Sequence, residues 1–110
     1  MIYLLKEKAS SEQTEEMLQT LHSYIKLAVD IETKILAGGG VLHADCEAVL
    51  LENGSLQQNV WSADWLPAVR EVTFESLINI RPRQNNFSME VEDEKLRKEI
   101  EKIVREIFEI

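Results

Sequence analysis

The segment after Asp93 constrains the fold most, because its apolar residues recur at helical spacing. Leu96, Ile100, Ile103 and Ile107 stand three or four positions apart, and Val104 adds to the same face. Asp93 is placed to cap the first turn, and Glu94–Lys98, Glu101–Arg105 and Lys102–Glu106 are spaced as ion pairs on the opposite side. A helix with one apolar stripe must bury it against another layer. The sequence therefore predicts a long C-terminal amphipathic helix packed on a sheet.

A second pattern, over residues 25–31, has a period of two. Ile25, Leu27, Val29 and Ile31 alternate with more polar residues, which favours a strand that starts at about Tyr24. Residues 32–33 then form a turn into a second strand over residues 34–37. The alternative is one long helix over residues 11–37, ended by the glycine that follows.

Five further elements are expected. Residues 2–5 form a short edge strand, and Ser10 with Gln13 forms a capping box that starts a helix. Residues 45–52 form a short helix, although residues 49–51 also suit a buried strand. Residues 59–65 and 71–80 are the best pair of strands. In the second of these, Glu75, Asn79 and Arg81 share one face.

This order of elements indicates the α+β class, in a single domain over residues 1–110. We expect a mostly antiparallel sheet of about four strands, with helices packed on one face. The other face of such a sheet stays open, and apolar residues there favour a symmetric dimer.

Charge and cysteine content exclude several classes of protein. The chain has 12 Lys and Arg against 20 Asp and Glu, a net charge of −8. This excess disfavours direct binding to nucleic acid or to anionic membranes. The single cysteine excludes an internal disulfide. Residues 1–10 do not resemble a signal peptide, and the apolar runs are too short for a membrane span, so we expect a cytoplasmic protein.

The densest group of reactive side chains is His43, Asp45 and Cys46, with Glu47 beside them. These are the candidate catalytic residues, because a helix N-terminus lowers a thiol pKa and an imidazole can act as its base. The neighbouring carboxylates oppose this, and a buried, unreactive Cys46 is the alternative. The spacing matches no metal site, so we predict neither a metal nor a cofactor.

Two segments are candidates for ligand binding. Gly38, Gly39 and Gly40 precede a helix and could surround a phosphate group, or could instead serve close packing and positive φ. The loop around residues 81–86 could bind a small anion through its arginines. Its candidate residues are Glu75, Asn79, Arg81, Arg83, Asn85 and Asn86. The alternative is that the arginines pair with nearby acids and the asparagines close a turn.

Trp61 and Trp65 lie on one face of the strand over residues 59–65. They are candidate interface residues of a homodimer, or else core residues.

Three segments carry a resemblance: residues 35–55 (ILAGGGVLHADCEAVLLENGS), 60–65 (VWSADW) and 74–90 (FESLINIRPRQNNFSME). They resemble a small uncharacterised family of bacterial proteins filed as a domain of unknown function. Ser62 stands where that family usually has Gly, and Phe87 where it has Arg. The resemblance implies a compact domain and no particular reaction.

Two functions remain open from the sequence. The first is a non-catalytic cytosolic binding or assembly module that forms a homo-oligomer, and we favour it because no motif demands chemistry. The second is a small hydrolase or transferase that acts on an anionic substrate through His43, Asp45 and Cys46, with Arg81 orienting the substrate.

Overall fold

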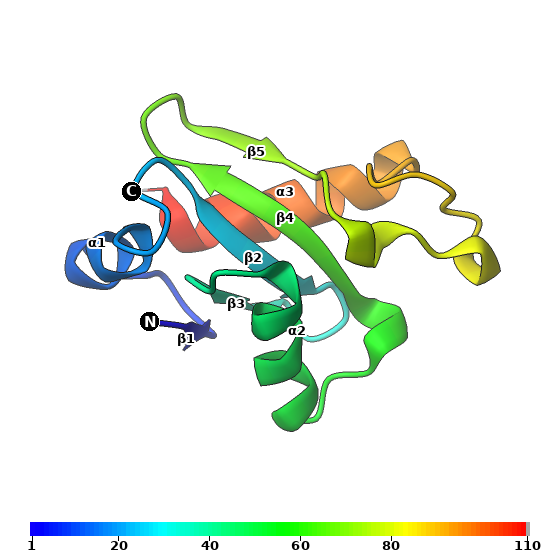
Figure 1. Cartoon of the computed structure of the whole chain (residues 1–110), viewed down its shortest axis with the longest axis horizontal. Coiled ribbons are helices and arrows are strands. Elements are labelled where there is room, and N and C mark those ends of the chain that lie inside the picture. Colours follow the sequence, from blue (N-terminus) through cyan, green and yellow to red (C-terminus); the bar gives the residue numbers. More distant parts are fainter. Residues whose placement is uncertain (110) are drawn as a thin grey trace.

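The computed structural model describes residues 1–109, which form three α-helices and a five-stranded sheet (Figure 1). The strands are β1 (Tyr3–Leu5), β2 (Ile25–Asp30), β3 (Ile35–Gly38), β4 (Val60–Leu66) and β5 (Glu71–Thr73). The α-helices are α1 (Ser11–Leu18), α2 (His43–Glu52) and α3 (Glu94–Phe108). Three short 3₁₀ turns complete the chain: η1 (Gln57–Asn59), η2 (Leu77–Asn79) and η3 (Pro82–Gln84).

The sheet has the order β1-β3-β2-β4-β5, and every neighbouring pair is antiparallel. This confirms the α+β class and the antiparallel sheet. The number of strands is five rather than about four, because the short edge strand β1 joins the sheet beside β3.

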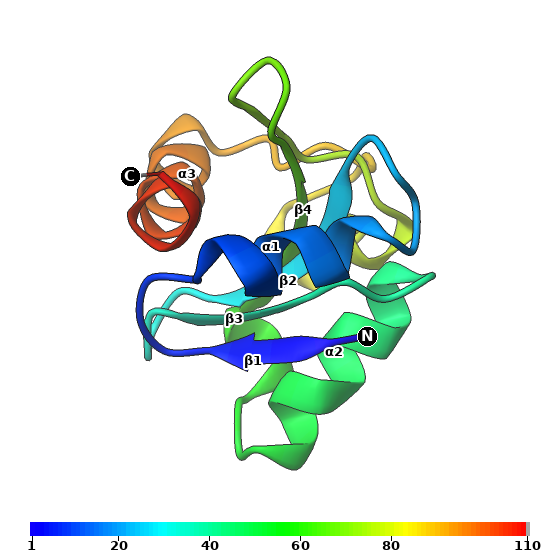
Figure 2. The same cartoon turned by 90° about the vertical axis from the view of Figure 1, so that its left-hand side faces the viewer.

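Helices cover both faces of the sheet, which corrects the prediction of one covered face. Figure 2 shows α1 and α3 on one side of the strands and α2 on the other. The alternation in β2 explains this: Leu27 and Val29 pack in the larger core with α3, while Ala28 packs in a smaller core with Cys46 of α2. With small residues on its second face, the sheet can accept a helix at close range.

Local signals set the helix ends as expected. Ser10 and Gln13 form both bonds of a capping box at α1. Asp93 accepts from the backbone N–H groups of Lys95 and Leu96 at the start of α3.

None of the helices in residues 1–109 combines the length and apolar character that a membrane crossing needs.

The alternative of one long helix over residues 11–37 is wrong. Asp30 ends β2 and its Oδ1 accepts from the backbone N–H groups of Glu32 and Thr33, which stabilises a turn. Lys34 then adopts a positive φ of 62°, and β3 returns beside β2. A side chain that binds the backbone two or three residues ahead competes directly with helix.

The strand predicted over residues 71–80 ends early, at Thr73. In the register of β4 and β5, Ser62 would face Glu75. Instead the side chain of Asn79 bonds to both backbone polar groups of Ser62. Because this amide takes the place of a strand residue, the chain leaves the sheet and turns into η2.

Candidate functional site

A row of polar side chains crosses three strands on the face that α2 covers only in part. Lys26 of β2 faces Asp64 of β4, which in turn faces Thr73 of β5. The sheet register alone brings these three side chains together, because residues directly opposite in neighbouring strands lie on the same face.

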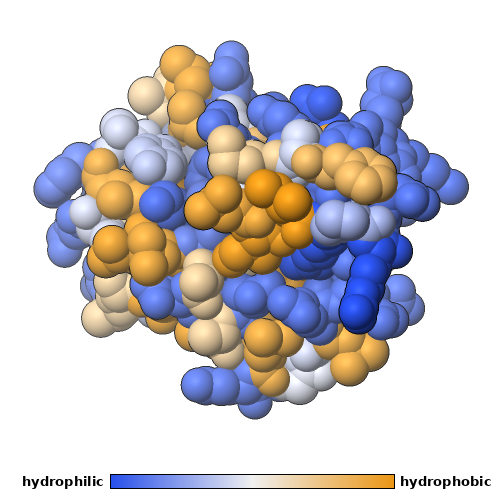
Figure 3. Space-filling model, turned by 45° about the vertical axis from the view of Figure 1, so that its right-hand side comes forward, coloured by the Kyte–Doolittle hydropathy of each residue, from blue (hydrophilic) through white to orange (hydrophobic). Residues whose placement is uncertain are grey.

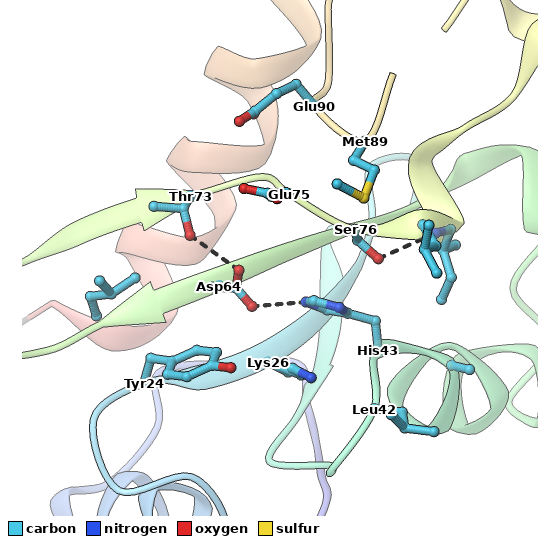
Figure 4. Close-up of a pocket in the computed structure, with 14 residues that line it drawn as sticks. Tyr24, Lys26, Leu42, His43, Asp64, Thr73, Glu75, Ser76, Met89 and Glu90 are labelled. Atoms are coloured by element: carbon cyan, nitrogen blue, oxygen red, sulfur yellow. Dashed lines mark hydrogen bonds and ion pairs between the residues drawn. The ribbon is translucent and has the colours of Figure 1, made fainter. Parts of the chain in front are cut away.

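His43, the first residue of α2, completes this row. Its Nε2 atom lies 2.8 Å from Oδ1 of Asp64, and Oδ2 of the same carboxylate accepts a hydrogen bond of 3.1 Å from the Thr73 hydroxyl (Figure 4). Because a carboxylate can only accept, the imidazole donates from Nε2. Within residues 1–109 its Nδ1 atom has no hydrogen-bond partner and is not enclosed. The pair thus presents a fixed imidazole with one free nitrogen.

This row forms the floor of a cleft of about 740 Å³. Its walls come from Tyr24 before β2, from the start of α2, from η2 and from residues 75–76 and 89–90. Apolar side chains line much of it: Leu42, Leu66, Leu77, Ile78 and Met89. A concave site with apolar walls and a few fixed polar groups is typical of ligand-binding sites.

Two carboxylates lie on one side of the His43–Asp64 pair, opposite Lys26 (Figure 4). They belong to Glu75 and Glu90, and the backbone N–H of Ser76 donates to the Met89 carbonyl at 3.0 Å between them. Within residues 1–109 neither carboxylate accepts a hydrogen bond or pairs with a base. The cleft therefore carries more negative than positive charge.

A second cleft, of about 770 Å³, lies on the other side of η2. Leu77 and Ile78 line both clefts, and Ile80 lines the second. We call these three residues the apolar ridge. The Leu77 side chain is 74% exposed, so the ridge stands out between the two clefts.

Cys46 lies outside the cleft and faces the smaller core. Its side chain is fully buried, and Sγ donates to the Lys26 carbonyl at 3.3 Å. Burial raises the thiol pKa to about 11, and the nearby carboxylate of Asp45 adds to the rise. A thiol with such a pKa is protonated at neutral pH and is a poor nucleophile.

The catalytic group predicted from the sequence is therefore not assembled. Asp45 is exposed, and its Oδ2 accepts from the backbone N–H of Leu42 at 3.2 Å, so it caps α2. Of the three candidates, only His43 reaches the cleft. Asp64 is the acidic partner of His43, in place of Asp45.

The three glycines serve close packing rather than an open cradle. All are buried, and Gly39 has a φ of 103°. A Cβ atom at Gly38 would lie 2.6 Å from a Leu27 methyl group, and one at Gly40 would lie 3.1 Å from Sγ of Cys46. This is the packing alternative of the sequence analysis, and it leaves no room for a phosphate group.

All three guanidinium nitrogens of Arg81 donate hydrogen bonds within the chain, so the predicted anion site loses its main donor. Nε donates to the Ile78 carbonyl at 3.0 Å, and Nη1 donates to the carbonyl of Gln57 at 2.9 Å and to Oε1 of Gln84 at 3.4 Å. Nη2 donates to the Val60 carbonyl and lies 3.6 Å from Oε2 of Glu47. These hydrogen bonds use four of the five N–H groups of the guanidinium, and the contact with Glu47 is an ion pair beyond hydrogen-bond distance.

The same guanidinium lies over the ring of Trp61, 4.5 Å from its centroid. Burial lowers the pKa of Arg81, and the Glu47 carboxylate opposes the shift. Arg81 thus ties α2, β4 and η2 together. It lines the second cleft, whereas Glu75 lines the first, so the two do not form one binding face as predicted.

The asparagines predicted to bind a ligand are structural. Asn79 is fully buried, and its Nδ2 also donates to the Phe74 carbonyl at 2.7 Å. Asn86 is buried as well and donates to the carbonyls of Asn79 and Glu90. Asn85 has a φ of 59° and ends η3. Arg83 is exposed at the second cleft.

Trp61 and Trp65 are core residues, each 3% exposed. Trp65 stacks on Phe108 of α3 with a centroid distance of 5.9 Å. An interface anchor needs an accessible ring, so the interface role predicted for these residues is wrong, and their alternative role in the core is correct.

Sequence reasoning missed the acidic half of the site. Asp64 stands between Trp61 and Trp65 in a strand, and only its polarity on a buried face indicates that it is a site residue.

Within residues 1–109, no three side chains of His, Cys, Asp or Glu lie close enough together to hold a metal ion.

Comparison with curated proteins and with solved structures finds no match. A family model does match, and it spans residues 3–107, nearly the whole chain. The family description assigns no function, in agreement with the resemblance seen in the sequence. The chain belongs to the family described as protein of unknown function (DUF5674).

Proposed function

We propose that the protein is a non-catalytic binding module whose site is the cleft beside His43 and Asp64. The observation that carries this proposal is the convergence of His43, Asp64 and Thr73, from three elements, on the floor of a cleft of about 740 Å³. Fixed polar groups on apolar walls give orientation and affinity together. The buried Cys46 and the engaged Arg81 support binding over thiol catalysis.

The test is a nuclear magnetic resonance titration of ¹⁵N-labelled protein with small water-soluble amines, carboxylic acids, amides and phenols. We expect saturable shifts of the backbone amides of Ala44, Asp64 and Thr73 for at least one class. His43→Asn should weaken that binding by about tenfold. The substitution removes the imidazole ring from the cleft and, with it, the hydrogen bond to Asp64 that fixes the ring. His22→Asn is the matched control, because His22 is exposed and lies outside both clefts. The absence of any saturable shift in the cleft would reject the proposal.

One observation favours the hydrolase alternative in a changed form. An imidazole oriented by a carboxylate, with Nδ1 free, is the arrangement of a general base. In this form His43 would take a proton from water, without Cys46 or Arg81. Hydrolysis of p-nitrophenyl acetate that exceeds the His43→Asn background by about a hundredfold would support it. Equal hydrolysis rates for the wild type and His43→Asn would reject the hydrolase and keep the binding module as the proposed function.

We also propose a cytoplasmic homodimer; because α2 packs on the sheet face expected to be open and Trp61 and Trp65 are buried, its interface would lie on another surface. Native mass spectrometry of untagged protein, purified without chelator, reports the number of subunits and any retained small molecule. A monomer at micromolar concentration would reject the dimer, and excess mass that is lost on denaturation would identify a ligand.

A further inference from the structure

The apolar ridge is held rigidly although it is exposed. The Ser76 hydroxyl accepts from the backbone N–H of Ile78 at 3.3 Å, and Nε of Arg81 donates to the Ile78 carbonyl at 3.0 Å. Beneath it, Asn79 anchors η2 to Ser62, and Asn86 donates to the Asn79 carbonyl at 2.6 Å. A surface loop needs no such buried network merely to connect two elements.

This network gives the ridge a fixed shape. An exposed apolar group on an immobile backbone loses little entropy when it is covered, which is the advantage of a preorganised binding surface. Figure 3 brings this side of the molecule forward and shows apolar side chains gathered at its centre, with hydrophilic side chains around them. Exposed apolar patches of this kind mark interaction sites.

The apolar ridge lies between the two clefts, and this position favours an extended ligand. Leu77 and Ile78 line both clefts, so the ridge separates two hollows of about 740 and 770 Å³. A small molecule fills one hollow and leaves the ridge uncovered. A segment of polypeptide that crosses the ridge can place side chains on both sides of it.

The charges select among possible partners. Glu75 and Glu90 border the ridge in the first cleft and have no partner within residues 1–109. A second copy of this chain would bring the same carboxylates together across a two-fold interface, and like charges placed so oppose association. A basic partner can cover the apolar ridge and also pair with these carboxylates, since lysine and arginine carry long apolar stems below their charge.

We propose that the apolar ridge and the first cleft together dock a basic, amphipathic segment of a partner protein. Its apolar side chains cover Leu77 and Ile78, and its lysine or arginine side chains pair with Glu75 and Glu90. This inference rests on the proposed function, because it names the class of partner for the same cleft.

The test uses four capped hexapeptides, each with two residue types in alternation. In three of them leucine alternates with lysine, with glutamine or with glutamate, and in the fourth glycine alternates with lysine. Binding to the full chain is followed by ¹H–¹⁵N shifts. We expect the leucine and lysine peptide to shift amides over residues 75–80 and 90, and to bind about tenfold more tightly than each of the others.

Two pairs of variants separate the contributions. The double variant Glu75→Gln and Glu90→Gln should bind the lysine and glutamine peptides equally, whereas Glu15→Gln, at an exposed position of α1, should still prefer the lysine peptide. Leu77→Ser should weaken the leucine and lysine peptide at least about fivefold. Val69→Ser, at a residue 59% exposed and outside both clefts, should not. All five substituted residues are exposed, and a dispersed spectrum shows that each variant folds.

Three outcomes would overturn the inference. They are equal affinity for lysine and glutamine peptides, shifts confined to α1 or α3, and a dimer that Leu77→Ser converts to monomer. In each of these outcomes, the titration with small molecules described under the proposed function can still show a ligand in the cleft, so the proposed function survives. If neither the small molecules nor the peptides shift the amides of the cleft, both proposals fail.

Discussion

The side-chain amide of Asn79 pairs with the backbone of Ser62 through both of its polar atoms. Oδ1 accepts from the Ser62 N–H at 2.9 Å, and Nδ2 donates to the Ser62 carbonyl at 3.0 Å. One side chain thus replaces a residue of the next strand. This replacement frees the chain to leave the sheet, and it places the apolar ridge between the two clefts.

Asn79→Ala should lower the free energy of unfolding by about 3 kcal/mol, because both polar groups of Ser62 are then buried without a partner. Urea denaturation measures the loss. Asn53→Ala is the control: Asn53 is exposed after α2, and its change should stay within about 0.5 kcal/mol. Similar losses in the two variants would contradict the structural role of Asn79.

Ser62→Ala should raise the free energy of unfolding by about 1 kcal/mol. The Ser62 hydroxyl is buried and has no hydrogen-bond partner within residues 1–109, so its removal ends a desolvation cost. Urea denaturation beside Ser23→Ala, at an exposed position, measures the gain. A clear loss of stability in Ser62→Ala would mean that the hydroxyl has a partner.

Arg81→Lys should lower the free energy of unfolding by about 3 kcal/mol. An ammonium group cannot replace the planar donors that reach the carbonyls of Ile78, Gln57 and Val60, and the nearby Glu47 would lose its ion pair. Arg83→Lys is the matched control at an exposed position. Equal stability of the two variants would show that Arg81 is not a structural residue.

Cys46 should not react with iodoacetamide in the native protein near neutral pH. Its thiol is fully buried and its pKa is raised to about 11, so the reactive thiolate is scarce and shielded. Mass spectrometry before and after denaturation in guanidinium measures the labelling. Rapid modification of the native protein would restore the thiol enzyme as a hypothesis.

Alkaline pH should destabilise the protein through the same thiol. Above the pKa of an unfolded cysteine, about 8.5, the unfolded chain loses the proton that folded Cys46 keeps up to its pKa of about 11, so stability falls as pH rises through this window. Between about pH 8 and about pH 10.5 the wild type should lose about 2 kcal/mol more than Cys46→Ala. Parallel pH profiles would contradict burial of the thiol.

Much of the fold follows from the sequence because its signals are local. The capping residues Ser10 and Asp93, the apolar spacing in α3 and the alternation in β2 each act within a few residues. Helix ends and strand faces depend on such short-range geometry. The α+β class and the positions of all three helices could therefore be predicted.

The functions of the polar side chains depended on the tertiary structure. His43 meets Asp64 across 21 positions, and Arg81 reaches the Gln57 carbonyl across 24. Whether an arginine is free to bind a ligand or is engaged in the core depends on which carbonyls the packing brings to it. The sequence by itself determined the helices, the strands β2, β3 and β4 and the apolar stripe of α3, since these arise from local periodicity. Only the tertiary structure decided that Asn79 and Arg81 build the scaffold while His43 faces a cleft, because hydrogen-bond partners distant in the chain are set by sheet register and helix packing.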